Sequence, residues 1–367
     1  MKIERIEVYP IRVNLRQVFM AAHGPMRVQE SVIVRVTTDD GYRGLGDVDP
    51  SPGYSEETLA EIVTNVRDLL GPALIDRDAL NAVEASHVMD ELLPRAYAAK
   101  AAVEMALWDI RGKRFGEPVC TVLGGRVRTD IGLNAWIGLL APEAAAREAE
   151  AWLARGFRSA KVKIGSGFEA DRERVAAVRS AVSSHMELRV DGNEAFSVDD
   201  AIRIGRALEP YDLRLLEQPV ARRDLDGLAR VRRAVGIPIM ADEAVEDAGT
   251  LIEIIRREAA DLVKVKVMKQ GGLLATCHLI AIAEAAGVAC VIGHGFGLTV
   301  STLAELHVAA SCRNVIDGVE CVGPLKMQDD VVKAPLVLEG GRVGVPAAPG
   351  LGAELDEESL ARHAVAV

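Results

Sequence analysis

The chain has 367 residues, of which 49 % are hydrophobic and 26 % charged, which is ordinary for a soluble globular protein with room for two domains. A net charge of −11 with dispersed basic residues argues against nucleic acid as a partner. No apolar run reaches the length of a membrane span, and the N-terminus lacks the apolar core of a signal peptide. Five scattered cysteines outside any C-x-x-C motif are expected to be reduced. We therefore expect a cytoplasmic protein that does not act on a membrane.

Residues 1–125 are predicted to form an α+β domain. The first 50 or so residues alternate like strands, with "DDG" as a hairpin turn. A helix is expected from Ser55 to Gly71, and a second in "YAAKAAVEMALWDIRGKRFG", with Gly116 as its stop. The Gly/Pro-punctuated segment 331–367 is expected to return to this domain and complete it.

Residues 126–330 are predicted to form a barrel, because eight short apolar runs alternate there with helical stretches. A polar residue ends each of the last seven runs, 24 to 28 residues after the previous one: Lys163, Asp191, Glu217, Asp242, Lys266, His294 and Glu320. Catalytic residues of TIM barrels come from the carboxyl ends of successive strands. This spacing therefore predicts a TIM-like barrel with an active site at that rim.

Three of these residues, Asp191, Glu217 and Asp242, are carboxylates on consecutive strands. Three like charges converging at one mouth require a cation, and ligation by oxygen alone selects a hard ion, Mg²⁺ or Mn²⁺. We expect these three residues to be its ligands.

The motif "KVK" places Lys161 and Lys163 on the same face of a short strand, while Lys266 lies on a strand across the metal. A lysine beside another cation in a partly desolvated site has a lowered pKa and can act as a base. We expect Lys161 to act in this way on Lys163 and to meet a substrate carboxylate.

The motifs "KVK", "VDGN", "LEQP", "ADE" and "KVMKQGG" resemble the enolase superfamily, in its mandelate racemase/muconate lactonizing enzyme subgroup. "ALWDIRGKRFGEPVCTVLGG" and "PLVLEGGRVGVPAAPGLGAELDEESL" extend the resemblance to most of the chain. It implies a modified (β/α)7β TIM barrel with an α+β capping domain, and abstraction of the proton α to a carboxylate through an ene-diolate. Lys163 and Lys266 would be the acid/base pair, supported by Lys161, and Asp242 rather than Glu243 would ligate Mg²⁺. We also expect a homo-oligomer.

The reaction is left with several alternatives. "GVECVGPLKMQDDVV" is similar to the strand-eight segment of muconate cycloisomerases and would place Glu320 at the site, which favours cycloisomerisation. Racemisation or epimerisation of N-acylamino acids or dipeptides is the second reading, and dehydration of an acid sugar, suggested by His294, is the third. A non-catalytic metal-binding scaffold is disfavoured, because scaffolding does not require the lysine pair. Lys264 stands where the family often has a neutral residue, and its role is open.

Specificity is expected from two irregular loops of the cap, residues 16–30 and 47–57, which would close over the barrel mouth. His23 and Arg27 are candidates to bind an anionic group of a small carboxylate substrate. Asp47 and Asp49 would bind a cationic group or stabilise the cap. His294 would either bind a substrate carboxylate or tether the "GHGFG" loop.

Overall fold

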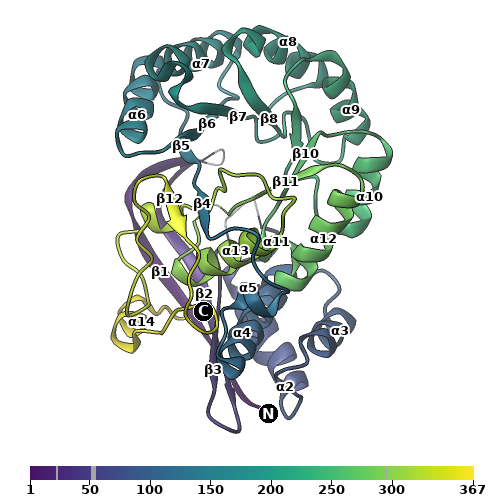
Figure 1. The fold of residues 1–367 in the computed structure, drawn as a ribbon, viewed down its shortest axis with the longest axis vertical. Coiled ribbons are helices and arrows are strands. Elements are labelled where there is room, and N and C mark those ends of the chain that lie inside the picture. Colours follow the sequence, from purple (N-terminus) through teal and green to yellow (C-terminus); the bar gives the residue numbers. More distant parts are fainter. Residues whose placement is uncertain (22–23, 51–54, 295) are drawn as a thin grey trace.

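The computed structural model of the chain describes residues 1–21, 24–50, 55–294 and 296–367. A cap built from the N-terminal elements lies at one end, and a ring of β/α units forms the other (Figure 1). None of the helices in these four stretches is long and apolar enough to cross a membrane.

The cap contains an antiparallel sheet in the order β1-β2-β3. Its strands are β1 (Ile3–Ala21), β2 (Gly24–Thr38) and β3 (Arg43–Val48). The predicted "DDG" turn is confirmed between β2 and β3, where Gly41 has a φ of +88°. The prediction of an irregular loop over 16–30 is wrong for the described residues, because β1 and β2 pair as far as Ala21 and Gly24.

The first cap helix differs from its prediction at both ends. It begins at Leu59 rather than Ser55, because Thr58 and Glu61 form a capping box. It also continues past Gly71, whose φ of −56° is helical. The consecutive segments are α1 (Leu59–Thr64), a π-helical segment (Asn65–Leu70) and α2 (Gly71–Leu74).

The remaining cap helices are α3 (Ala82–Leu92), α4 (Tyr97–Phe115) and α5 (Val119–Val122). The predicted end of α4 is confirmed, since Gly116 adopts a φ of +70° there. β3 lies directly on α4, and a Cβ at Gly46 would stand only 1.8 Å from the Ala102 carbonyl oxygen. Glycine at this position is therefore required by the close approach of strand to helix.

The second region is a modified TIM barrel built on a parallel sheet in the order β11-β10-β9-β8-β7-β6-β5. Its strands are β5 (Ala135–Ile137), β6 (Ser159–Lys163), β7 (Glu187–Asp191), β8 (Leu213–Glu217), β9 (Ile239–Ala241), β10 (Leu262–Val265) and β11 (Ala289–Ile292). The segment around Val319 and Glu320 closes the ring, because it bridges in parallel to Leu133 on one side and Gly293 on the other.

The helices of this region are α6 (Pro142–Ala154), α7 (Phe168–Val182), α8 (Val198–Leu208), α9 (Leu225–Ala234), α10 (Ala248–Arg256), α11 (Val267–Gln270), α12 (Leu273–Ala285) and α13 (Thr299–Ser311). Helices α6 to α10 and α12 lie around the outside of the ring, whereas α11 and α13 lie toward the cap (Figure 1). Short 3-10 turns lie at Ser183–His185, Glu209–Tyr211 and Gly323–Leu325.

The C-terminal segment touches both regions. β12 (Arg342–Gly344) pairs antiparallel with β4 (Asp130–Gly132), the strand that leads into the barrel. α14 (Glu357–His363) contacts β1, and the amide of Val365 donates to the Pro10 carbonyl. The segment thus connects β4 to the cap sheet.

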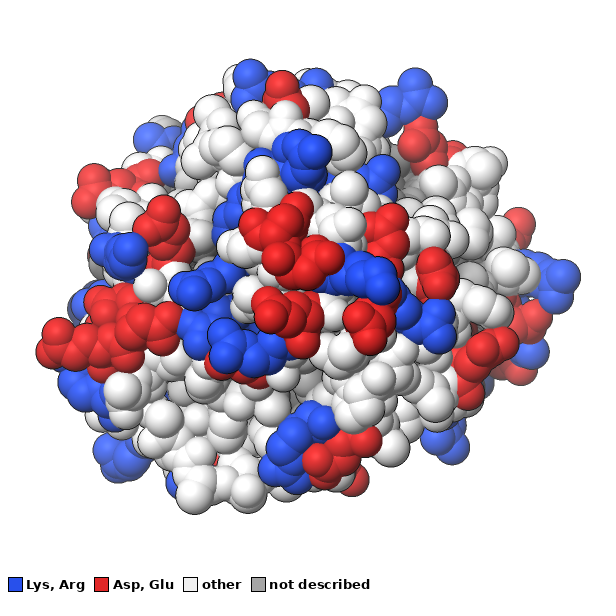
Figure 2. Space-filling model, turned by 90° about the horizontal axis from the view of Figure 1, so that it is seen from below, with Lys and Arg blue, Asp and Glu red and all other residues white. Residues whose placement is uncertain are grey.

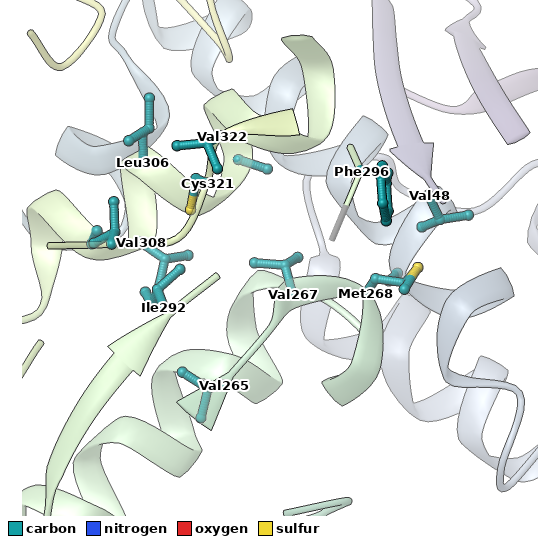
Figure 3. Close-up of a cluster of buried hydrophobic side chains, with 14 of the residues drawn as sticks. Val48, Val265, Val267, Met268, Ile292, Phe296, Leu306, Val308, Cys321 and Val322 are labelled. Atoms are coloured by element: carbon teal, nitrogen blue, oxygen red, sulfur yellow. The ribbon is translucent and has the colours of Figure 1, made fainter. Parts of the chain in front are cut away.

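Buried contacts join the cap to the barrel. Figure 3 shows Val48, at the end of β3, in one hydrophobic cluster with Phe296 and Met268 from the barrel. On the face seen in Figure 2, acidic and basic side chains lie intermixed, in agreement with the dispersed charge of the sequence.

Candidate active site

The predicted site residues converge at the carboxyl ends of β6 to β10. Cα pairing aligns Lys163 with Asp191 and Asp191 with Glu217 across three parallel strands, so these side chains leave the sheet side by side. Asp242 and Lys266 directly follow β9 and β10. The carboxylates of Asp191, Glu217 and Asp242 are almost completely buried. The structure therefore brings these side chains together at one mouth of the barrel.

The β6 lysines contact the carboxylates from one side of this mouth. The Lys161 ammonium lies 3.0 Å from Asp191 Oδ2 and 3.1 Å from Glu217 Oε2, and also donates to Glu320. The Lys163 ammonium donates to Asp191 Oδ2 at 2.7 Å and to Asn193 Oδ1. Lys161 therefore reaches deeper into the barrel than Lys163.

A second lysine pair with the same i, i+2 spacing contacts the carboxylates from the β10 side. The Lys264 ammonium donates to Glu217 Oε1 at 2.9 Å and to Glu320. The Lys266 ammonium lies 2.8 Å from both carboxylate oxygens of Asp242. "KVK" at residues 161–163 and "KVK" at residues 264–266 thus face one another across the carboxylates.

These surroundings shift the pKa values of Lys161 and Lys266 in opposite directions. Burial opposes the charge of Lys161, but Asp191, Glu217 and Glu320 outweigh burial and raise its pKa well above the usual value. Burial, reinforced by the positive charge of Lys269, lowers the pKa of Lys266 well below the usual value. Lys161 is therefore a fixed positive charge, whereas Lys266 is a lysine that gives up its proton readily.

The carboxylates have the chemistry of a site for a hard divalent cation. Burial and the charge of Asp191 raise the pKa of Glu217 well above its usual value, because two carboxylates so close together repel each other. Burial acts in the same direction on Asp191, but Lys161 and Lys163 overcome it and hold that pKa below its usual value. Three buried carboxylates on adjacent strands offer only oxygen ligands, and this donor set fits Mg²⁺.

Glu243 also reaches this site, although it is adjacent to Asp242 in the sequence. Alternation along a strand would point it away from Asp242, but β9 ends at Ala241 and the alternation stops there. Glu243 Oε1 accepts from Asn193 Nδ2 at 3.0 Å, while its buried Oε2 has no hydrogen-bond partner. Burial and the charge of Asp242 raise its pKa to about 7.

His294 is engaged inside the protein. Its Nδ1 accepts the amide of Gly297 at 2.9 Å, and its Nε2 lies 3.1 Å from Thr302 Oγ1. Burial and nearby lysines, Lys326 first, lower its pKa to about 3, so the ring is neutral. These contacts support the role of a loop tether. His294 also groups with Glu305 and Cys321 as three potential metal-binding side chains, but Cys321 Sγ already donates to Glu305 Oε2 at 3.0 Å.

The cap residues predicted to bind substrate have different positions. His23 lies outside the described residues. Arg27 is exposed on β2, and none of the contacts of the described residues ties it to the carboxylates. Asp47 and Asp49 are buried at the cap–barrel junction, where they accept amide hydrogen bonds from Leu298 and Phe296. These contacts support the expectation that Asp47 and Asp49 stabilise the cap rather than bind a cationic group.

Sequence reasoning did not single out four further residues of the site. Lys269 donates to Asp242 Oδ1 at 2.9 Å, and Asn193 connects Lys163 with Glu243. Lys326 lies over two aromatic rings at the barrel mouth, and Arg189 fills the barrel interior 3.8 Å from Glu320. Arg189 precedes Asp191 by two residues, so strand alternation could have identified it.

Two family models match the chain. One, described as the mandelate racemase / muconate lactonizing enzyme N-terminal domain, covers residues 5–124, and one described as enolase C-terminal domain-like covers residues 144–359.

Individual relatives match over nearly their whole length. An N-succinyl-L-Arg/Lys racemase from Bacillus cereus is 32 % identical over 98 % of this chain and 97 % of its own. Its crystal structure gives a TM-score of 0.96, covering 100 % of this chain and 99 % of that one. Muconate cycloisomerase 1 from Pseudomonas putida is 34 % identical over 99 % of this chain and 98 % of its own. A dipeptide epimerase from Enterococcus faecalis, crystallised with Mg and L-Leu-L-Tyr, is 33 % identical with a TM-score of 0.92, covering 96 % and 99 %.

Proposed function

The chain belongs to the enolase superfamily, in its mandelate racemase/muconate lactonizing enzyme subgroup, and on this premise we propose that it is a Mg²⁺-dependent isomerase that moves the proton α to a carboxylate. Within that class we propose a racemase or epimerase of N-acylamino acids or dipeptides. Relatives at similar identity include such enzymes and also cycloisomerases, so the choice between them depends on the site.

The observation that carries this proposal is the placement of two lysines on opposite strands. Lys163 ends β6 and Lys266 follows β10, and each donates to a different carboxylate of the same buried group. A substrate α-carbon held between them would present one face to each ammonium. Racemisation by two bases requires this arrangement, because one neutral lysine removes the proton and the other, protonated lysine returns a proton to the opposite face.

The roles of the remaining side chains follow from their charges. Asp191, Glu217 and Asp242 would hold Mg²⁺, which supplies positive charge next to the substrate carboxylate and so stabilises the ene-diolate. Lys161, with its raised pKa, would keep a fixed positive charge beside the same oxygens. Asn193 contacts both Lys163 and Glu243, and would hold the Lys163 ammonium in position.

Cycloisomerisation is the second candidate, and Glu320 is the observation that favours it. Its carboxylate is buried at the site, where Lys161 and Lys264 donate to it, as the similarity of the strand-eight segment to muconate cycloisomerases implies. The dehydratase reading is weaker, because it depended on His294, and both nitrogens of that ring have partners within the protein.

Exchange of the α-proton with solvent tests the proposed function. The purified protein with Mg²⁺ is incubated in deuterated water with a panel of N-acylamino acids, dipeptides and cis,cis-muconate, and each acid is followed by proton NMR and chiral chromatography. We expect loss of the α-proton signal together with inversion for at least one acylamino acid or dipeptide. Lactone formation from muconate without inversion of any amino acid would favour the second candidate. A panel with neither reaction would contradict both.

A further inference from the structure

Two of the five free cysteines meet where α12 packs against α13 (Figure 1). Cys277 lies in the second turn of α12, and Cys312 directly follows the last residue of α13. The Cys277 thiol donates a hydrogen bond to the sulfur of Cys312. Both residues are partly exposed, whereas Cys120, Cys290 and Cys321 are buried. The fold therefore presents this pair of thiols to solvent in direct contact with each other.

The residues that follow Cys312 fix its position against α12. The guanidinium of Arg313 donates to the carboxylate of Glu284 on that helix. The side-chain amide of Asn314 donates to the Val288 carbonyl at 2.8 Å, just beyond the helix. A disulfide forms without backbone movement only where two cysteines are already close, and these contacts keep the two segments together.

Cys312 also has the electrostatic surroundings of a reactive thiol. The hydrogen bond from Cys277 lowers the pKa of Cys312 below its usual value, and the charge of Arg128 acts in the same direction against burial. Arg128 is held beside it, because its Nη2 donates to the Cys312 carbonyl at 3.3 Å. The same thiol–thiol hydrogen bond raises the pKa of Cys277, so the proton between the two sulfurs stays on Cys277. The thiolate, which is the reactive form of cysteine, is therefore favoured at Cys312.

The other three cysteines lack this combination. Burial raises the pKa of Cys120, and it raises that of Cys290 to about 12. Burial and the charge of Glu305 also raise the pKa of Cys321, whose thiol donates to that carboxylate at 3.0 Å. An oxidant that reacts with thiolates is therefore expected to select Cys312.

We propose that Cys312 and Cys277 form a redox-sensitive modification site, at which a peroxide converts the two thiols into a reversible disulfide between α12 and α13. The Cys312 thiolate attacks a peroxide oxygen, the O–O bond breaks, and the departing hydroxide takes up a proton to leave as water. The Cys277 sulfur then attacks the resulting Cys312 sulfenic acid. The S–S bond forms, the S–O bond breaks, and the second hydroxide leaves as water with the Cys277 proton. The thiol pair loses two electrons and the peroxide gains them. This proposal does not depend on the proposed isomerase activity.

The test treats the full-length, reduced protein with hydrogen peroxide, removes the excess, counts thiols in denaturant and maps peptides by mass spectrometry without reduction. We expect the loss of two of the five thiols, a linked Cys277–Cys312 peptide pair, and the return of all five thiols after dithiothreitol. Cys277→Ala should leave a sulfenic acid on Cys312, which dimedone traps as an adduct. Cys290→Ala, which removes the nearby buried thiol, is the matched control and should still form the disulfide. Circular dichroism checks the fold of both variants.

Retention of all five thiols after peroxide treatment would overturn the proposal, as would a disulfide that joins two chains or a different pair of cysteines. A dimedone adduct on any cysteine other than Cys312 in Cys277→Ala would contradict the assignment of Cys312 as the attacking thiol. Loss of the disulfide in folded Cys290→Ala would contradict a site made of two cysteines. The peptide map of the wild-type protein decides the matter even if a variant fails to fold.

Discussion

Lys161 and Lys266 are both buried at the barrel mouth, yet their neighbours shift their pKa values in opposite directions. Three carboxylates surround the Lys161 ammonium, whereas Lys266 contacts Asp242, which Lys269 also contacts. Burial acts on both lysines, so the opposite directions of their pKa shifts come from the neighbouring charges, which make Lys161 a permanent cation and Lys266 a proton carrier. This difference underlies the proposed roles of Lys161 as a fixed positive charge and of Lys266 as a base.

The metal ligands give a first prediction. Asp191→Asn, Glu217→Gln and Asp242→Asn should each weaken Mg²⁺ or Mn²⁺ binding by at least about a hundredfold, because each removes a charged oxygen ligand where even supporting residues are worth 10–100-fold. Mn²⁺ binding by electron paramagnetic resonance measures this, and circular dichroism checks the fold.

Glu243→Gln is the matched control, since it alters a buried carboxylate next to Asp242. We expect its metal affinity to stay within a few-fold of wild type. Loss of the ion in Glu243→Gln with retention in Asp242→Asn would reverse the ligand assignment.

Strand periodicity determined which site residues could be predicted from the sequence. Lys163, Asp191 and Glu217 end strands of regular spacing, so their convergence could be read from the chain. The position of the Glu243 side chain could not be predicted, because β9 ends at Ala241 and the turn that follows sets the direction of that side chain. Lys326 lies in a segment without periodic structure, and only the folded chain places it over Trp136 and Phe296.

At the scale of elements, carboxylates of the cap supply the N-caps of two barrel helices. The residues preceding α12 and α13, Gly272 and Leu298, offer no side-chain cap. Glu104 on α4 instead accepts the amides of Leu273 and Leu274, at 2.7 and 3.0 Å. Asp47 accepts the amides of Leu298 and Ser301 and the Ser301 hydroxyl. Helix formation in the barrel is thus coupled to docking of the cap.

Asp47 gives a prediction on pH dependence. Burial and the charge of Asp49 raise its pKa to about 7 in the folded chain, against an unfolded value of 3.8. A raised pKa means that the folded state favours the protonated form, so this contribution to stability is complete below pH ~4 and is lost as the pH rises through about 7. We expect the free energy of unfolding to fall between pH 5 and 8 by roughly 2–3 kcal/mol more in wild type than in Asp47→Asn.

Urea unfolding at the two pH values measures this difference. Asp199→Asn, which alters an exposed aspartate, serves as the control and should keep the wild-type slope. An unchanged pH dependence in Asp47→Asn would show that Asp47 ionises normally in the folded chain.

The hydrogen bonds that cross between cap and barrel could not have been predicted from the sequence. Asp47 precedes Leu298 by 251 residues, and no local pattern marks an aspartate that caps a helix so far away. Local sequence signals did predict where some elements end, as at Gly116, which follows the last residue of α4. They failed at Gly71, where the hydrophobic packing of the cap continues the helix through a glycine. The domain boundaries at residues 125 and 330 remain predictions.

For the whole molecule, these crossing contacts predict that cap and barrel unfold together. Hydrogen exchange followed by mass spectrometry near the urea midpoint should show α4, α12 and α13 losing protection in one step. Glu104→Ala removes the acceptor of three N–H groups, including Trp108 Nε1, and should destabilise both regions equally, by about 2–4 kcal/mol. Exchange of the cap peptides while α12 and α13 remain protected would contradict a shared transition.

The even spacing of strand-end residues over the second half of the chain predicted a TIM-like barrel, and its modified (β/α)7β form was implied by the resemblance to the enolase superfamily. The eighth strand was the least regular part, since in the described residues isolated bridges at Val315, Val319 and Glu320, rather than a continuous ladder, close the ring. The placement of the two lysine pairs depends on the strand order of the barrel, because β6 and β10 lie on different sides of β7, β8 and β9. The two "KVK" motifs oppose each other for that reason, although more than 100 residues separate them.

The central claim is that Lys163 and Lys266 each serve one face of the same α-carbon. The most direct test is exchange of the α-proton in deuterated water, measured separately for the two enantiomers of the substrate with Lys163→Ala and Lys266→Ala, and with Lys333→Ala as control. We predict that both variants lose inversion, that each still exchanges the α-proton of one enantiomer, and that the two variants retain opposite enantiomers. Full inversion by both lysine variants would contradict the account.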